Sequence, residues 1–356
     1  MKIVKRLLIT IGILVLVIGG STFWMLYRSG AFREIKPHFA GRCEAVPLPG
    51  SSEDIQVDRE RGMAYLSVID RKSIVEGKDA QGTVMRVDLN TRPFAAVDAL
   101  LSRPSSLRPH GLSLYVGADG VRRLFVINHG RDRGGDSEAV ELFIETAPGE
   151  FSHVETFHGR ALNSPNDLVA VGPRQFYVAN DKALGGAFAG ILQMAGIGAS
   201  PLSYFDGGQA RDVLTDIASG GGINAAPDYR TLYIAETTGK RLRIVDRGED
   251  GSVSERMRVE LDTAPDNIDV AADGSLWVAG HANTLALVRH FIGGTPAPSQ
   301  VWRVALGPGA AASVEEVYLD DGKQISAGSV GATWDKLLLI GSITERKILI
   351  CERAGP

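Results

Sequence analysis

The chain has 356 residues and a formal net charge of −4 without any block of Lys or Arg, so it is not expected to bind nucleic acid. Beyond residue 40 it exceeds the usual size of one hydrophobic core, yet no linker divides it. That combination favours small repeated units wrapped around an axis.

The first 28 residues differ in character from the rest of the chain. Basic residues precede an uncharged apolar stretch over residues 7–27, which as a helix is long enough to cross the ~30 Å hydrocarbon core of a bilayer. Aromatic side chains near its end match an interfacial belt. A cleaved signal peptide is the alternative, although its apolar region is usually shorter and is followed by a small-x-small site. We expect an uncleaved signal-anchor helix over residues 1–28, then a linker over residues 29–40.

A short apolar run recurs six times in the remaining chain, at intervals of about 50 residues. The runs cover residues 63–66, 124–127, 176–178, 232–234, 276–278 and 337–340. Polar turns and a second strand follow several of them. Six such units, each with room for four strands, predict an all-β fold, a six-bladed β-propeller over residues 41–353. A large β-sandwich would show no such recurrence, and solenoid repeats are shorter.

The two cysteines lie near the ends of this domain. Cys43 precedes the first repeat and Cys351 ends the last one, so a bridge between them would close the ring of blades. In the chain-entropy model, closing a loop of about 300 residues is worth roughly 5–6 kcal/mol at most. Two free buried thiols are the alternative. A pair that joins the ends of a domain suits an oxidising compartment, so we expect the domain to lie outside the cytosol, in a periplasm or an extracellular or lumenal space.

Polar clusters recur at the edges of the repeats, most of them at a similar position ahead of an apolar run. They are Glu53-Asp54, His110-Gly111-Leu112, Asn166-Asp167, Asn224 and Asp266-Asn267. Corresponding loops of different blades would gather them at one end of the channel. Carboxylate and amide oxygens suit calcium, whereas zinc and iron favour His or Cys. Adjacent residues in an extended segment face opposite ways, so each adjacent pair could serve two different ions. Taken singly, each cluster is also an ordinary loop or turn sequence.

In order and spacing, these motifs resemble those of the paraoxonase/arylesterase family over nearly the whole chain. The resemblance implies two calcium ions in the central tunnel of a six-bladed propeller. It assigns the catalytic calcium to Glu53, Asn166, Asn224, Asp266 and Asn267. A structural calcium would be held by Asp54, Asp167 and the main-chain oxygen of Leu112. The family's histidine pair falls on His110 and His129, and its closing disulfide falls on Cys43 and Cys351.

Members of this family are typically lactonases with arylesterase activity, and some also hydrolyse organophosphates. The resemblance therefore implies a small lactone or ester substrate, with calcium stabilising the oxyanion. His110 is the candidate general base and His129 the proton relay. Alternatively, His110 orients the substrate or supports the loop of Leu112, and Asp266 is the base or nucleophile. His281 and Asp181 are expected to line the pocket, whereas His153 and His158 are expected to be structural.

Two departures from the family bear on substrate range and membrane contact. Lys182 stands where vertebrate members often have a His, and residues 183–200 are rich in Gly and Ala where those members have a more aromatic, amphipathic helix.

Three other proteins of this architecture fit parts of the sequence. A strictosidine-synthase-like propeller would have no paired calcium ligands, and a gluconolactonase-like propeller uses fewer metal ligands and usually lacks an anchor. A non-catalytic, membrane-anchored binding propeller would leave the pair His110 and His129 without a role. The sequence gives no indication of the oligomeric state.

Overall fold

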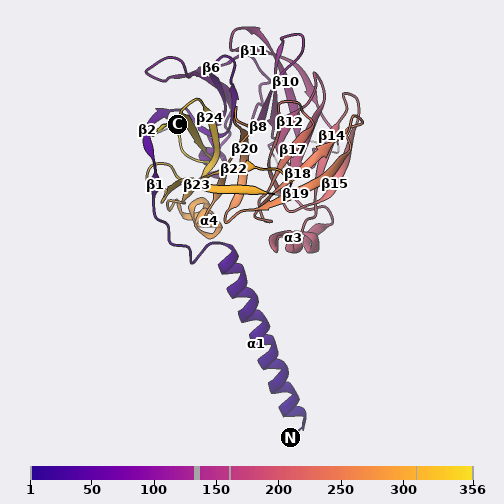
Figure 1. The fold of residues 1–356 in the computed structure, drawn as a ribbon. Coiled ribbons are helices and arrows are strands. Elements are labelled where there is room, and N and C mark those ends of the chain that lie inside the picture. Colours follow the sequence, from indigo (N-terminus) through magenta and orange to yellow (C-terminus); the bar gives the residue numbers. More distant parts are fainter. Residues whose placement is uncertain (1, 132–136, 160–161, 310, 355–356) are drawn as a thin grey trace.

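The computed structural model describes residues 2–131, 137–159, 162–309 and 311–354. Helix α1 (Lys2–Arg28) leads into six β-sheets that surround a central axis as blades (Figure 1). The prediction of an all-β, six-bladed propeller with an N-terminal apolar helix is confirmed.

The strands of each blade follow one another from the axis to the rim. Blade 1 contains β3 (Ser51–Asp58), β4 (Met63–Ile69), β5 (Thr83–Asp88) and β6 (Ala96–Asp98). Blade 2 contains β8 (Pro109–Val116), β9 (Arg122–Asn128), β10 (Ala139–Ala147), β11 (Glu150–Phe157) and β7 (Leu100–Ser102). Blade 3 contains β12 (Pro165–Ala170), β13 (Phe176–Asn180), β14 (Ser200–Phe205) and β15 (Ala210–Ile217).

The other three blades repeat this order. Blade 4 contains β16 (Gly220–Ala225), β17 (Thr231–Glu236), β18 (Arg241–Arg247) and β19 (Val253–Glu260). Blade 5 contains β20 (Ala264–Val270), β21 (Leu276–His281), β22 (Ser299–Leu306), β23 (Ala312–Asp320) and β1 (His38–Phe39). Blade 6 contains β24 (Gly328–Trp334), β25 (Leu337–Ser342), β26 (Lys347–Arg353) and β2 (Gly41–Pro47).

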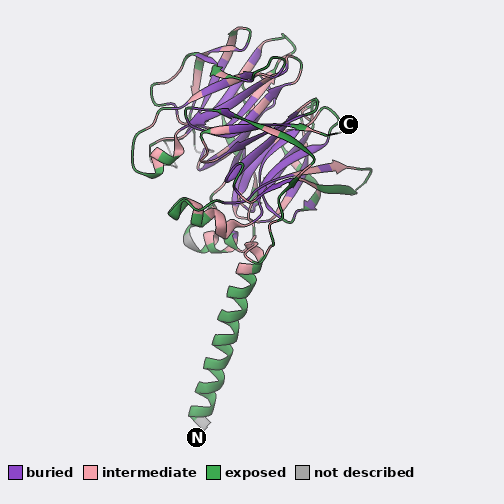
Figure 2. Cartoon of the chain, turned by 90° about the vertical axis from the view of Figure 1, so that its left-hand side faces the viewer, coloured by how far each residue is buried: buried purple, intermediate pink, exposed green. Residues whose placement is uncertain are grey.

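Apolar side chains fill the spaces between blades, with one buried cluster between each neighbouring pair. The apolar runs found in the sequence fall on the second strand of each blade. Those strands are buried on both faces, which explains why they read as continuous apolar runs rather than alternating ones. Figure 2 shows the strands as largely buried, whereas α1 is exposed along most of its length.

The first two strands of each blade are antiparallel, so the start of each inner strand and the end of the second strand lie at the same end of the propeller. Three helices leave the second strands at that end: α2 (Arg71–Val75), α3 (Gly186–Met194) and α4 (Thr284–Gly293). Helix α1 projects from the side where α3 and α4 lie (Figure 1). Its residues Ile3–Arg28 form a helix long and apolar enough to cross a membrane.

The end of α1 and the segment over residues 29–40, expected to be a linker, lie against the propeller. The Arg28 guanidinium donates to the main-chain oxygen of Thr238 at 2.7 Å, and the Thr284 N–H donates to the Ser29 oxygen at 2.8 Å. Further along, β1 pairs with β23. The helix is therefore fixed to the domain through several contacts rather than through a free tether.

The ring is closed by the two ends of the chain. Strand β2, from the N-terminal side, pairs with the final strand β26, and Cys43 lies directly opposite Cys351. These cysteines form a disulfide across a sequence separation of 308 residues. The predicted bridge is confirmed, and the alternative of two free thiols is wrong.

Breaking this closure should destabilise the whole ring. We expect Cys351→Ser to lower the melting temperature by about 5–15 °C, because loss of a native disulfide typically costs about 2–5 kcal/mol. The control is the double variant Cys43→Ser/Cys351→Ser, whose melting temperature should fall no further than that of either single variant. Differential scanning calorimetry measures both, and an unchanged melting temperature for either variant would contradict a stabilising role for the bridge.

Candidate functional site

Each of the six inner strands carries a β-bulge near its start. The register shifts lie between Ser52/Ile55, Pro109/Leu112, Pro165/Asp167, Gly220/Ile223, Pro265/Ile268 and Gly328/Val330. A bulge releases residues from the hydrogen-bond ladder and redirects their side chains. The residues it releases here are Glu53-Asp54, His110-Gly111, Asn166, Gly221-Gly222, Asp266-Asn267 and Ser329. Most of the polar clusters predicted from the sequence therefore meet at one end of the channel.

Glu53 lies at the centre of the first group of contacts. The Asn267 amide donates to Glu53 Oε1 at 2.8 Å and to its main-chain oxygen at 3.0 Å. His110 Nε2 lies 3.7 Å from Glu53 Oε2. Nearby in blade 5, His281 Nε2 lies 3.0 Å from the carboxylate of Asp266, one of the predicted ligands.

A second group lies beside the first and contains Asp54, Leu112 and Asp167. Asp54 accepts a hydrogen bond from the Leu112 N–H at 2.8 Å, and Asp167 accepts one from the Ile223 N–H at 2.8 Å. A Cβ on Gly111 would lie 2.5 Å from Asp167 Oδ1 and 2.6 Å from its Cα. Only glycine lets the inner strands of blades 2 and 3 approach this closely.

Burial changes the ionisation of these carboxyl groups. It raises the pKa of Glu53 to about 8, and the charge of Asp266 adds to the shift. Burial raises the pKa of Asp54 to about 7, and burial followed by the charge of Asp54 raises the pKa of Asp167 well above its ordinary value. Carboxylates packed in this way favour a bound cation, because a cation would stabilise their charged forms.

Among the residues that the bulges release, Glu53 Oε2, Asn166 Oδ1 and Asn267 Oδ1 are buried and have no hydrogen-bond partner in the described part of the chain. Buried polar atoms normally have a partner, and atoms that only accept could be satisfied together by a cation. Within the described residues, no group of three His, Cys, Asp or Glu side chains is arranged to hold a metal ion. Amide and main-chain oxygens would therefore have to complete the ligand set, and these residues supply them.

Asn224, expected among the ligands, has both of its side-chain polar atoms bonded to the main chain. Its Oδ1 accepts from the Ala225 N–H and its amide donates to the Ile268 oxygen, both at 2.8 Å. It lines a separate cavity of about 180 Å³ formed by the later parts of the inner strands. The reason is register, since the bulge of blade 4 releases Gly221 and Gly222 and Asn224 follows beyond it.

Side-chain hydrogen bonds link every neighbouring pair of inner strands into a closed circle. In four of these bonds a main-chain N–H donates to a side chain of the preceding blade: Leu112 to Asp54, Ala170 to Ser113, Ile223 to Asp167 and Thr333 to Asp269. In the other two a side chain donates to a main-chain oxygen of the following blade: Asn224 to Ile268 and Ser329 to Glu53. Asn224 therefore has an evident structural role. The circle also holds the bulges of all six blades in a fixed relation.

The two predicted catalytic histidines lie together in blade 2. The ring centroids of His110 and His129 are 4.6 Å apart, with the planes tilted by 51°. His153 instead pairs with Glu141 at 2.7 Å, and the ring of His158 bonds the main-chain oxygen of Glu138 at 3.2 Å. Both contacts agree with the structural roles expected for His153 and His158.

Asp181, expected to line the pocket, follows β13. The Ser164 hydroxyl donates to its carboxylate, and its main-chain oxygen accepts from the Ser219 hydroxyl at 3.0 Å and from the Gln193 amide in α3. These contacts fix α3 and the start of β12 at this end of the propeller. Lys182, the departure noted beside it, is exposed.

A cavity of about 630 Å³ lies at the same end of the propeller, on the side of α1, and the sequence analysis did not predict it. Its lining is largely apolar and comes from the end of α1 with Trp24 and Met25, from α3 with Met194, and from α4 with Leu285 and Val288. Its lining includes Ala264, the first residue of the strand that carries Asp266. It also includes Thr237, which lies against the bulge of blade 4, because a Cβ on Gly221 would be 2.4 Å from the Thr237 hydroxyl.

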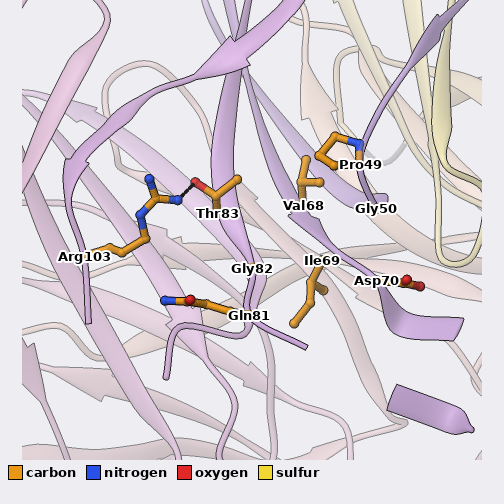
Figure 3. Close-up of a pocket in the computed structure, with 9 residues that line it drawn as sticks. All are labelled: Pro49, Gly50, Val68, Ile69, Asp70, Gln81, Gly82, Thr83 and Arg103. Atoms are coloured by element: carbon orange, nitrogen blue, oxygen red, sulfur yellow. Dashed lines mark hydrogen bonds between the residues drawn. The ribbon is translucent and has the colours of Figure 1, made fainter. Parts of the chain in front are cut away.

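A smaller cavity of about 230 Å³ lies in blade 1 and is shown in Figure 3. Its lining includes Asp70, Gln81 and Arg103, and the Arg103 guanidinium donates to Thr83. None of the residues predicted to bind metal or catalyse lies in it, so we place the functional site at the bulges instead.

Comparison with known proteins gives matches over most of the chain. The arylesterase family model matches residues 66–353. Serum paraoxonase/arylesterase 2 of Gallus gallus is 30% identical over 336 residues, covering 91% of this chain and 92% of that protein. Serum paraoxonase/arylesterase 2 of Homo sapiens is 27% identical over 351 residues, covering 96% and 97%.

Solved structures share the architecture at much lower identity. A luciferin-regenerating enzyme superposes with a TM-score of 0.53 at 12% identity, covering 88% of this chain and 96% of its own. A putative gluconolactonase gives 0.51 at 12% identity, covering 90% and 94%. At this identity the likeness concerns the fold alone.

The different positions of the two asparagines give a matched pair of variants. We expect Asn166→Ala to weaken calcium binding by at least about 10- to 100-fold, the usual loss when even an outer partner of a metal ligand is removed. Asn224→Ala should leave the affinity within about threefold while lowering the melting temperature, because its amide bonds only the main chain. Isothermal titration calorimetry with calcium chloride measures the affinity. Equal losses of affinity in both variants would place Asn224 among the ligands after all.

Proposed function

The chain belongs to the arylesterase family, and we propose that it is a calcium-dependent hydrolase of lactones and aryl esters anchored in a membrane by α1. One observation carries the proposal. Buried carboxylates and unpartnered carbonyl oxygens converge at one end of the channel, directly beside a pair of histidines. A purely binding propeller would have no need for this arrangement, since buried carboxylates are costly without a cation.

Four residues would hold a catalytic calcium: Glu53, Asn166, Asp266 and Asn267. Their donors are all oxygens, which calcium prefers. Glu53 and Asp266 would balance the two positive charges while the amides add none. A second calcium would take Asp54, Asp167 and the main-chain oxygen of Leu112. When bound, the catalytic ion would supply a Lewis acid that polarises the substrate carbonyl and stabilises the developing oxyanion.

The proposed proton transfers use the histidines of blade 2. His110 stands within 3.7 Å of Glu53, so a base there would face a water next to the bound carbonyl. His110 takes a proton as the water oxygen attacks the carbonyl carbon, and His129 can accept it from His110. The proton returns to the ring oxygen as the carbon–oxygen bond breaks, which gives a hydroxy acid from a lactone. His281 Nε2 lies 3.0 Å from the Asp266 carboxylate. A carboxylate held by a neighbouring side chain in this way is better suited to bind a metal ion than to act as a free base.

Blade 4 is the side from which the substrate would approach. Where blades 1, 3 and 5 present charged or amide side chains, its bulge presents only Gly221 and Gly222. Beyond Gly221 lies Thr237 and with it the apolar cavity of about 630 Å³. A cavity of this size and lining would hold the apolar part of an ester or lactone. The end of α1 forms one wall of that cavity.

We infer that the propeller lies on the extracytoplasmic side of the membrane. Support comes from the disulfide between Cys43 and Cys351, which suits an oxidising compartment, and from the length and apolar character of Ile3–Arg28.

The first test of this function is removal of the metal. Chelator-treated protein should lose hydrolysis of aliphatic lactones and aryl esters, and calcium should restore it better than magnesium, because magnesium demands tighter octahedral geometry. Phosphotriesters belong in the same substrate panel as a test for a side activity. Full activity in a thoroughly metal-free preparation would contradict the proposal, whereas an inactive preparation that still binds calcium would favour a binding propeller.

The second test separates the histidine from the metal. His110→Gln should lower kcat for lactones by about 10²- to 10⁴-fold, the usual value of a general base, with little change in calcium affinity. His129→Gln should cost less, because water can replace a relay. His153→Gln, outside the site, is the control and should keep the wild-type rate. If His110→Gln stayed within about threefold of wild type, Asp266 would become the leading candidate for the base.

A further inference from the structure

We propose that Glu138 is a positioning residue for the histidine pair, an inference that rests on the proposed function. Its carboxylate Oε2 lies 2.6 Å from Nδ1 of His129, and its side chain is 0% exposed. Contacts therefore lead outward from the site in sequence: Glu53 to His110, His110 to His129, and His129 to Glu138.

The hairpin of β9 and β10 creates this contact. Asn128, the last residue of β9, pairs with Ala139, the first residue of β10. The next residues outward, His129 and Glu138, are therefore opposite one another across the hairpin. The Glu138 main chain is held in turn, because its oxygen bonds the ring of His158 at 3.2 Å. The position of Glu138 is thus set by the register of two buried strands.

The chemical consequence concerns the tautomer of His129. An ionised carboxylate only accepts hydrogen bonds, so Nδ1 of a neutral His129 carries the proton and Nε2 is left to receive one. A carboxylate behind an imidazole also stabilises the imidazolium that forms when a proton arrives, as in serine-protease triads. Burial strengthens both effects, since the surroundings screen the charge weakly. Glu138 would hold His129 ready to accept the proton that His110 removes from water.

A second histidine–carboxylate pair in the same hairpin serves as the control. Glu141 lies 2.7 Å from His153 and also accepts from Asn128 and Thr156. The ring of His153 packs edge-on against Phe143 rather than against the site. Glu141 is as buried as Glu138, but its partner His153 has no part in the proposed reaction. Substitution of Glu141 therefore measures how much such a pair contributes to stability alone.

The experiment compares Glu138→Gln, Glu138→Asp and Glu141→Gln in the full-length protein loaded with calcium. Glu138→Gln should lower kcat for a lactone by about 10- to 100-fold, as outer partners of functional histidines do, with KM and calcium affinity within about threefold. Glu138→Asp should recover part of the rate. Glu141→Gln should lower the melting temperature as much as Glu138→Gln does while keeping kcat within about threefold.

Nitrogen-15 spectra of the histidine rings give a readout that does not depend on turnover. Wild-type His129 should show the Nδ1–H tautomer, and Glu138→Gln should change it, because a glutamine amide can donate to Nδ1. An Nε2–H tautomer in the wild type, or equal kcat losses in Glu138→Gln and Glu141→Gln, would overturn the proposal. If the wild type hydrolyses no ester or lactone, the proposed function fails, and the spectra still decide whether Glu138 sets the tautomer.

Discussion

The burial of several carboxylates at the centre of the propeller is the constraint on which the rest of the structure depends. Glu53, Asp54 and Asp167 are almost completely removed from water, and such groups are costly unless donors or a cation compensate. The bulges supply part of that compensation by turning main-chain N–H groups such as those of Leu112 and Ile223 toward the carboxylates. The hydrogen bonds that join each inner strand to the next hold those donors in place. A propeller with an open ring could not maintain that circle, so closure of the fold and construction of the site are one requirement.

The six blades share one architecture, yet they contribute unequally to the site. Blades 1, 3 and 5 present oxygen donors, blade 2 presents histidines, and blades 4 and 6 present small residues such as Gly221 and Ser329. The oxygen donors therefore come from alternate blades around the axis, and blades 4 and 6 leave space between them. That alternation explains how a nearly symmetric fold could surround an ion with ligands and still leave an approach at blade 4. The apolar cavity reaches Thr237, which lies against Gly221 of that blade.

The sequence predicted the features that depend on composition and period. The apolar runs revealed the number of blades because those strands are buried on both faces, and the position of the cysteines revealed how the ring closes. It could not predict features that depend on strand register. The family resemblance assigned Asn224 to the catalytic calcium, whereas in the structure the bulge of blade 4 ends before Asn224 and its amide bonds the neighbouring strand. Glu138 was missed for the same reason, since only the pairing of β9 with β10 places it opposite His129. Contacts of the segment over residues 29–40 with Glu316 and Thr284 are equally long-range.

Pairing of β2 with β26 also dictates the order of events during synthesis. Strand β2 leaves the ribosome soon after helix α1, but its partner β26 is made last. Until the final residues emerge, β2 is an unpaired edge, and the sixth blade lacks its outer strand. The inner circle of hydrogen bonds cannot form before β24 arrives either. We therefore expect folding to finish only after the complete chain has been synthesised, so that a prematurely terminated chain would lack both the closed ring and the assembled site.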